Sequence, residues 1–581
     1  MLARSGDVER ANQLLADLAA EGNADAETLG MLARTHKDLA LATLDAAPRA
    51  AHLASAFAIY TRAYEDARRD AADGDAWYTG INAATVAVLQ GDLEAARRIA
   101  REVRTLCLLA LTHRAAATDY WLEATLGEAA LILGDDSESI AHYSHAADLA
   151  AGGFGNLAST RRQLELLAKC LPGPIAAILE IIEIPPVLMY TGHMIDQPAR
   201  AAPRFPMELE AAIAAAVREK FAILRPLAAY GSAACGSDIL CLEAMREIGG
   251  ETHIVLPFPA GEFHRVSVDF APGGWSERFE RALVAADSVT VTSDHRARGS
   301  AATFEYANLV LTGMARLRAQ ALHTHLLGFA IWDGRPSSGR AGAAELVRIW
   351  QSQNVALEQI RTGEAPAGAP LPGSASLPGS APLPRSGLLP PDQPLAGFSH
   401  ENRAMLFADA VGYSGLSEDQ TPHFINQFLG AVADLNARTA QRPEHIETTG
   451  DGLYMVFGSV RDAGNYALQL NRLVTGTDWA SRGLPGGLSI RIALHCGPVY
   501  CGRNPVTGSP LYTGPHTSRT ARIEPVTPPG QVYASSAFAA VAAATGVGDL
   551  TMQYIGRMPL AKGYGLLGLY HVRQRDCAMT A

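Results

Sequence analysis

The chain has 581 residues, of which 48% are hydrophobic and 18% are charged. This length is too great for one hydrophobic core, and this composition excludes a disordered or fibrous protein. The 48 Lys and Arg residues are outnumbered by 59 Asp and Glu residues, and the resulting net charge of -11 argues against nucleic acid as the main partner. We therefore expect several globular domains.

The cysteine pattern and the hydropathy pattern bear on the compartment. The seven Cys residues form no C-x-x-C pair, which predicts neither a disulfide framework nor structural zinc and favours a reducing environment. The first residues carry mixed charges without an apolar core, and the most apolar stretch, near 174–190, is interrupted by Glu and Pro. We therefore expect a cytoplasmic protein with no membrane partner.

Residues 1–172 are rich in Ala and Leu at helical spacing. Gly-Asp pairs precede helical patterns at 6–7, 91–92 and 134–135, so this region resembles degenerate tetratricopeptide (TPR) repeats. The last two pairs are 43 residues apart, and this predicts irregular repeats or insertions; the alternative is a plain helical bundle. In both cases we expect an all-α domain that contacts an unidentified protein partner or a neighbouring domain.

Residues 184–352 alternate strand-like runs (PPVLMYTG, HIVLPF, SVTVTS, LLGFAIWDG) with helical patterns. This alternation predicts an α/β doubly wound parallel sheet, whose ligands bind at the C-terminal strand ends. Three glycine-containing segments, TGHM, YGSAACGSD and WDGRPSSGRAG, fall there. The region resembles the LOG/SLOG group of Rossmann-like domains, which implies an unidentified nucleotide ligand. The alternative is that the glycines only close turns, with Asp238 and Glu243 capping a helix.

Residues 363–397 are dominated by Pro, Gly, Ser and Ala. Such a segment cannot bury a core, so we expect a mobile linker. We also expect it to keep the last domain near the N-terminal half without fixing its orientation, so that any control acts by proximity.

Residues 401–575 contain several motifs in a fixed order: FADAVGYS, TTGDGLYMVF, LHCGPVYCG, the S-x-x-x-R-x-E of SRTARIE, and LAKG. These motifs and their order resemble the class III nucleotidyl cyclase catalytic domain. The resemblance implies an α+β, ferredoxin-like fold and a bacterial-type lyase. Such an enzyme converts a nucleoside triphosphate to a 3′,5′-cyclic nucleotide and pyrophosphate.

This chemistry requires activation of the ribose 3′-hydroxyl and stabilisation of phosphoryl charge. Two divalent ions can do both, and Mg²⁺ or Mn²⁺ requires hard oxygen ligands. Asp409 and Asp451 each end a strand beside small residues, and the resemblance implies that they bind both ions together with the carbonyl of Ala410; a lone Asp there would otherwise cap a turn. The following loop could turn N–H groups toward the β- and γ-phosphates through Val411, Gly412, Tyr413 and Ser414.

Two basic residues match further family positions. Arg522 corresponds to the arginine that stabilises the transition state, and Lys562 to the lysine that holds the terminal phosphates. The alternatives are a helix Arg paired with Glu524 and a solvated turn Lys.

The base-reading positions depart from the family pattern. Glu447 stands where adenylyl cyclases place Lys and guanylyl cyclases place Glu, while Leu511 stands at the second base-reading position. Ser518 replaces the usual Asn and could still donate a hydrogen bond, with Arg519 beside it adding charge. ATP is favoured by the family as a whole and GTP by Glu447, and a pyrimidine triphosphate stays open.

The family's site lies between two catalytic domains, and this chain carries one. The resemblance therefore implies a homodimer with Asp409 and Asp451 of one chain facing Arg522 and Lys562 of the other. We expect the 1–350 half to regulate cyclic nucleotide (cAMP-type) signalling. The alternative is a signalling scaffold whose cyclase-like domain has lost catalysis and binds nucleotide or protein partners.

Overall fold

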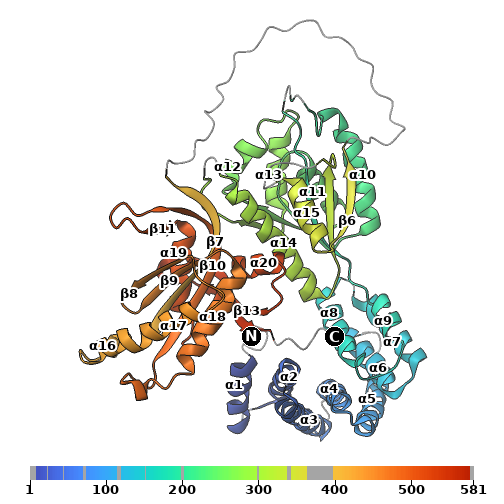
Figure 1. Cartoon of the computed structure of the whole chain (residues 1–581). Helices are drawn as coiled ribbons and strands as arrows, with labels where there is room; N and C mark the ends of the chain where they lie inside the picture. Colours follow the sequence, from blue (N-terminus) through green and yellow to red (C-terminus); the bar gives the residue numbers. More distant parts are fainter. Residues whose placement is uncertain are drawn as a thin grey trace.

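The computed structural model describes residues 8–22, 24–43, 45–69, 73–113, 119–150, 152–197, 200, 202–297, 300–335, 342–362 and 397–575. They form a helical domain, a middle α/β domain and a C-terminal domain built on a mixed sheet (Figure 1). Within these residues, no helix combines the length and the apolarity needed to cross a membrane.

The helical domain confirms the expected all-α region, and its consecutive helices pack against each other. Gly91 and Gly134 adopt left-handed backbone conformations after α4 and α6, as the Gly-Asp turns predict. The pair at 6–7 lies outside the described residues. The helices in order are α1 (Val8–Ala20), α2 (Ala26–Ala42), α3 (Ala46–Arg69), α4 (Asp73–Gln90), α5 (Leu93–His113), α6 (Tyr120–Leu133), α7 (Asp136–Ala150), α8 (Phe154–Leu167) and α9 (Ile175–Ile181).

The middle domain has a six-stranded sheet in the order β4-β3-β2-β1-β5-β6, and every neighbouring pair is parallel. The strands are β1 (Val187–Gly192), β2 (Ala228–Gly231), β3 (Glu251–Leu256), β4 (Ser288–Val291), β5 (Leu326–Trp332) and β6 (Ala356–Arg361). The helices are α10 (Glu210–Leu224), α11 (Ser237–Glu247), α12 (Ala260–Ser267), α13 (Trp275–Ala285), α14 (Ala302–Leu322) and α15 (Ala343–Ser352). The parallel sheet agrees with a doubly wound fold, but β6 extends the domain beyond residue 352.

The C-terminal domain is built on an eight-stranded sheet in the order β13-β14-β12-β10-β7-β9-β8, with β11 paired to β10. Its strands are β7 (Ser399–Val411), β8 (His445–Thr449), β9 (Gly452–Phe457), β10 (Ser489–Arg503), β11 (Pro510–Thr513), β12 (Val532–Ser535), β13 (Leu550–Pro559) and β14 (Leu566–Gln574). Its α-helices are α16 (Gln420–His423), α17 (Gly430–Arg438), α18 (Val460–Thr475), α19 (Pro515–Ile523) and α20 (Ser536–Ala544). Helix α18 is amphipathic and packs its apolar side on β10 and β7.

Helix α14 lies between the middle sheet and the C-terminal domain and packs against α20, β7 and β10 (Figure 1). The Tyr306 hydroxyl donates to the carbonyl of Cys496 at 2.7 Å. Gly313 lies so close to α20 that an added Cβ would be 1.7 Å from the carbonyl oxygen of Ala540. These contacts join the two domains directly, and the expectation of a mobile linker over 363–397 stays a prediction. Residues 363–396 of the predicted linker lie outside the described residues.

The helical domain contacts the other end of α14. His323, the left-handed residue that ends α14, is 3.0 Å from a carboxylate oxygen of Glu165, and its carbonyl accepts from Arg161 at 3.1 Å. Helix α14 therefore contacts all three domains.

Candidate active site

The structure brings Asp409 and Asp451 together at one end of the C-terminal sheet. Asp409 lies near the end of β7 opposite Gly452, and Asp451 occupies the turn that joins β8 to β9. The Ala410 N–H donates to the Asp451 carbonyl at 3.2 Å. Gly450 turns the chain with a φ of +66°, a conformation that favours glycine. The two carboxylates are thus held by adjacent strands.

Arg491 is the positive charge beside this pair, and the sequence analysis did not identify it. It lies opposite Asp409 in the β10–β7 register, and its guanidinium is 3.0 Å from Asp409 Oδ2 and 3.1 Å from Glu524 Oε1. An arginine in the otherwise apolar run LSIRIALHCG is the sequence signal that could have identified it. Glu524, the acid of S-x-x-x-R-x-E, therefore pairs with Arg491 rather than with Arg522.

Burial raises the pKa values of Asp409 and Glu524, and neighbouring charges modify both shifts. Burial and the neighbouring Asp451 raise the pKa of Asp409, while Arg491 partly offsets the shift. Burial raises the pKa of Glu524 to about 7, with further contributions from Asp409 and Asp451. Asp409 and Glu524 therefore share the Arg491 guanidinium, with Asp451 nearby, and a bound cation would relieve the repulsion between the three carboxyl groups.

The donor set fits a hard divalent cation. Asp409 and Asp451 offer only carboxylate oxygens, with the Ala410 backbone beside them, and Mg²⁺ is commonly held by one or two carboxylates together with substrate phosphates. Among the residues that the structure describes, no cluster of three His, Cys, Asp or Glu side chains forms a complete metal centre.

The loop after Asp409 begins with Gly412, whose φ is +101°, and continues as a 3-10 turn over Tyr413–Gly415. The first N–H groups of such a turn have no acceptor within it, so they are available to an anion. The Tyr413 ring packs edge-on against Phe424, with 4.8 Å between centroids. Val411 is half-buried and Ser414 is exposed, so this loop offers backbone donors and one hydroxyl.

Ser518 and Arg522 lie one turn apart on the same side of α19. Ser518 is exposed, and the Arg522 guanidinium lies 5.5 Å from the centre of the Tyr564 ring. The Nε of Arg522 is buried without a hydrogen-bond partner among the described residues. Within the described residues Arg522 forms no ion pair with Glu524, and its buried Nε could donate to a ligand.

Lys562 lies in the turn between β13 and β14, next to α19. Its backbone is left-handed, with a φ of +59°, and its side chain is exposed. The structure thus groups Lys562 with Arg522 and Ser518, whereas Asp409 and Asp451 form a second group. No hydrogen bond or ion pair within the described residues joins the two groups.

Glu447 lies on β8, and one carboxylate oxygen is 2.8 Å from His445 Nε2. It is paired in register with Tyr454, whose hydroxyl donates to the Tyr512 carbonyl at 3.1 Å. Leu511, which precedes Tyr512 on β11, is half-buried and pairs with Gly502. Glu447 is therefore oriented by a histidine, and Leu511 offers only apolar surface.

The opposite side of α19 is attached to the middle domain. Arg519 forms an ion pair with Asp294 at 3.1 Å, and His516 Nε2 lies 3.2 Å from the hydroxyl of Ser293. Arg519 thus serves the domain contact rather than adding charge beside Ser518. The loop after β4 therefore contacts the side of α19 that is opposite Ser518 and Arg522.

Comparisons with known proteins give the class of the C-terminal domain. Residues 397–570 match the family model described as the adenylate and guanylate cyclase catalytic domain, and residues 1–87 match the model described as Tetratricopeptide Repeats-Sensor. The C-terminal domain is therefore a nucleotidyl cyclase catalytic domain. The chain carries a nucleotidyl cyclase lyase, joined to a TPR-type helical region.

Several solved structures are similar to this domain. The guanylate cyclase domain of RhGC from Catenaria anguillulae, in complex with GTP, is 22% identical, with 31% of this chain and 100% of that chain covered and a TM-score of 0.27. The adenylyl cyclase CyaB from P. aeruginosa is 13% identical, with 32% and 99% covered and a TM-score of 0.27. The comparison with curated proteins gave no match. The LOG/SLOG resemblance of the middle domain stays a prediction.

Proposed function

We propose that the chain converts a nucleoside triphosphate to a 3′,5′-cyclic nucleotide and pyrophosphate, at a site that uses two Mg²⁺ or Mn²⁺ ions. The observation that carries this proposal is that Asp409, near the end of β7, and Asp451, in the turn before the adjacent strand β9, lie together beside Arg491. Within a domain that matches the cyclase family, this arrangement has the donors that a metal–triphosphate complex requires.

The reaction forms a bond between the ribose 3′-oxygen and the α-phosphorus and breaks the bond from that phosphorus to the bridging oxygen of pyrophosphate. The two metal ions, when bound, lower the pKa of the hydroxyl and neutralise charge on the triphosphate. Asp409 and Asp451 hold them, while Arg491 and the N–H groups after Gly412 face the phosphates. Arg522 stabilises the charge that develops on the α-phosphoryl oxygens, and Ser518 orients the ribose or the α-phosphate.

The separation of the two residue groups supports a homodimer. Asp409 lies on β7 and Asp451 in the β8–β9 turn, while Arg522 lies on α19 and Lys562 in the β13–β14 turn, and within the described residues no hydrogen bond or ion pair joins the two groups directly; Arg491 links Asp409 to Glu524, two residues after Arg522. A second copy, docked head to tail, would bring the groups of the two chains together and create two equivalent sites. In this arrangement Lys562 binds the terminal phosphates of a nucleotide whose metal ions are held by the other chain.

ATP is the first substrate to test, on the ground of the family as a whole. One specific observation favours GTP: Glu447 is fixed by His445 and can accept from both the N1–H and the amino group of guanine. Leu511 makes no polar contact to any base, so CTP and UTP also belong in the test. In all cases we propose that the N-terminal domains regulate the reaction.

The test incubates the full chain with Mn²⁺ and each of ATP, GTP, CTP and UTP, with the cyclic product and pyrophosphate detected by mass spectrometry. We expect one triphosphate to give a 3′,5′-cyclic product. Asp451→Asn should reduce the rate at least about 10²-fold, because one metal ligand loses its charge. Asp478→Asn is the matched control, since Asp478 lies on a surface turn away from the sheet. Nucleotide binding without product from any triphosphate would instead support the scaffold alternative.

A further inference from the structure

Helix α19 carries Ser518 and Arg522, yet it is too short to be stable alone. It has nine residues, Pro515–Ile523. Helices shorter than about 12–15 residues are marginal in water, so tertiary contacts decide where such a helix lies. The position of Ser518 and Arg522 therefore depends on the residues that hold the other side of α19.

The loop after β4 in the middle domain provides part of this support. The Arg519 guanidinium contacts both carboxylate oxygens of Asp294, at 3.1 and 3.2 Å. His516 Nε2 is 3.2 Å from the hydroxyl of Ser293, and both of these side chains are buried. His516 and Ser518 are two positions apart on the helix, so they point in nearly opposite directions. The middle domain thus holds α19 while Ser518 stays exposed.

This loop is itself bonded to the middle domain on both sides of the contact. The Thr292 N–H donates to the Leu256 carbonyl at 2.9 Å, and the Thr292 hydroxyl lies 3.2 Å from the same carbonyl oxygen. Further along the loop, the Arg296 N–H donates to a carboxylate oxygen of Glu262 at 3.3 Å. Because β3 and α12 anchor it in this way, the loop is a fixed support for α19.

A chain of hydrogen bonds continues from the loop into the cyclase domain. His516 Nδ1 is 2.9 Å from His495 Nε2, and His495 Nδ1 is 2.7 Å from the hydroxyl of Ser535. Ser535 caps α20 by accepting from the Phe538 N–H at 3.0 Å. Gly497 makes room for this chain, because an added Cβ there would be 2.3 Å from His516 Nδ1. Helix α19 is therefore linked to the helix that packs on α14.

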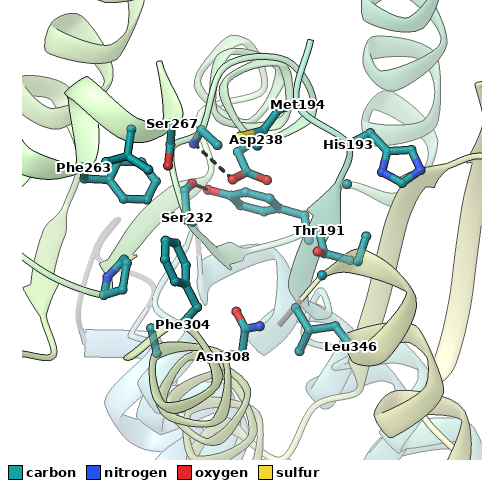
Figure 2. A pocket seen from close by; sticks show the side chains of 18 of the residues that line it. Thr191, His193, Met194, Ser232, Asp238, Phe263, Ser267, Phe304, Asn308 and Leu346 are labelled. Atoms are coloured by element: carbon teal, nitrogen blue, oxygen red, sulfur yellow. Dashed lines mark hydrogen bonds between the residues drawn. The ribbon is translucent and has the colours of Figure 1, made fainter. Parts of the chain in front are cut away.

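Helix α14 supports α19 at the same point. The Tyr306 ring lies edge-on to the His516 ring with 5.2 Å between centroids, and the Tyr306 hydroxyl donates to the Cys496 carbonyl. Phe304 and Asn308 point into a cavity of the middle domain (Figure 2). Tyr306 is two positions from each of them, so its side chain points the other way, toward the cyclase domain. Two elements of the middle domain, the loop after β4 and α14, therefore hold His516.

We propose that Ser293 and Asp294 are positioning residues for the cyclase reaction: from the middle domain they hold α19, so that Ser518 and Arg522 lie where the ribose and the α-phosphate require them. Neither Ser293 nor Asp294 touches the substrate. The effect on the reaction rests on the proposed cyclase function, whereas the attachment of α19 does not. In the proposed homodimer, the middle domain of one chain acts on a nucleotide whose metal ions the other chain holds.

The first test is steady-state kinetics of the full chain with Mn²⁺ and the triphosphate that gives product. Asp294→Asn and Arg519→Gln should each lower kcat at least about fivefold, because small displacements of a catalytic group are costly. KM should change less than about twofold, since Arg522 acts mainly on charge that develops in the transition state. Asp269→Asn and Arg442→Gln are the matched controls, both at exposed positions. Variants as active as these controls would overturn the proposal.

A double-mutant cycle separates positioning from a loss of stability. If Asp294 acts through Arg522, Asp294→Asn should lower kcat less than about twofold once Arg522→Ala is present, because the group that it positions is then gone. Asp294→Asn combined with Arg519→Gln should be no slower than the slower single variant, because both changes remove the same ion pair. Equal factors in the wild-type and Arg522→Ala backgrounds would overturn the proposal, since a loss of folded enzyme lowers every activity by the same factor.

Amide hydrogen exchange gives a readout that needs no turnover. In EDTA and without nucleotide, Asp294→Asn should speed exchange in α19 at least about fivefold, whereas β7 and β9 should exchange as in the wild type. Unchanged exchange in α19 would overturn the proposal whatever the activity. Faster exchange in α19 of a chain that makes no cyclic product would support the attachment and contradict only the proposed cyclase function.

Discussion

At the residue scale, Arg491 decides the electrostatics of the candidate active site. It is the guanidinium that contacts both Asp409 and Glu524, at 3.0 and 3.1 Å. Without it, Asp409 and Glu524 would lose the ion-pair partner that the described residues give them. The arginine therefore holds the carboxylates in place and can transfer its hydrogen bonds to an incoming phosphate.

Arg491→Gln should reduce kcat/KM for the triphosphate by about 10²-fold or more, because a charged donor to the phosphates is lost. The measurement is steady-state cyclase activity across a range of Mn²⁺ concentrations. Arg503→Gln is the matched control, since Arg503 lies on the same strand and is exposed. Equal activity of the two variants would remove Arg491 from the site.

A second feature at this scale is the buried histidine pair behind α19. His495 Nε2 and His516 Nδ1 are 2.9 Å apart, and His516 also contacts Ser293 of the middle domain. Burial, together with Arg519 and His400, lowers the pKa of His516 to about 3. Burial also lowers the pKa of His495. Both side chains are neutral where the domains meet.

Acidification should therefore lower the free energy of unfolding of the chain. The pKa of His516 is lower in the folded state than the unfolded value of about 6.5. Its contribution to the free energy of unfolding is therefore complete above pH 6.5 and is lost as the pH falls toward 3. Between pH 7 and 5 the loss is about 2 kcal/mol. Thermal unfolding at both values should show a lower midpoint at pH 5. His516→Gln should reduce this difference, whereas His423→Gln, at an exposed position, should not.

At the element scale, α14 is the helix that joins the three domains. Its contacts with α20 are close because Gly313 has no side chain. An alanine there would place Cβ against the backbone of Ala540, which cannot move as a flexible side chain can. Helix propensity thus favours alanine at this position, whereas the packing of the two domains requires glycine.

Gly313→Ala should lower the thermal midpoint and expose α20 to hydrogen exchange, although glycine-to-alanine changes in helices usually stabilise by about 1 kcal/mol. Gly430→Ala is the matched control, because an added Cβ at Gly430 meets nothing within 4 Å. The control should keep or raise the midpoint. A Gly313→Ala variant that is as stable as the control would show that the two domains do not meet here.

The sequence predicted some elements of this architecture and missed others for physical reasons. The strands bearing Asp409 and Asp451 were predictable because their hydrophobic pattern and motif order agree. Strand β2 has four residues, and β6 (ALEQIR) is polar because it lies at the sheet edge, so neither has a strong pattern. The role of Arg491 could not be predicted, because it depends on the register of β10 against β7, which places Arg491 opposite Asp409.

At the scale of the whole molecule, the proposed homodimer places half of each site on each chain. Mixing Asp451→Asn and Arg522→Ala variants should therefore restore activity that neither has alone. Random exchange makes about half of the dimers mixed, each with one intact site of two, so activity should reach about a quarter of wild type. Activity assays before and after mixing, with analytical ultracentrifugation, give the measurement. An inactive mixture in which mixed dimers form would exclude a shared site.

The domain arrangement could not be predicted from the sequence. The Pro- and Gly-rich composition of 363–397 indicates only that this segment adds no core. The contacts of Tyr306 with Cys496 and of Asp294 with Arg519 join residues about 200 positions apart. No local sequence pattern predicts such pairs, because each of these residue types would be equally acceptable on an exposed surface.

Because α14 packs against α20, the middle and C-terminal domains meet through residues that lie outside the peptide segment between β6 and β7. The peptide segment between β6 and β7 is therefore a place where a fluorescent reporter or a recognition tag could be inserted without breaking the contact between α14 and α20.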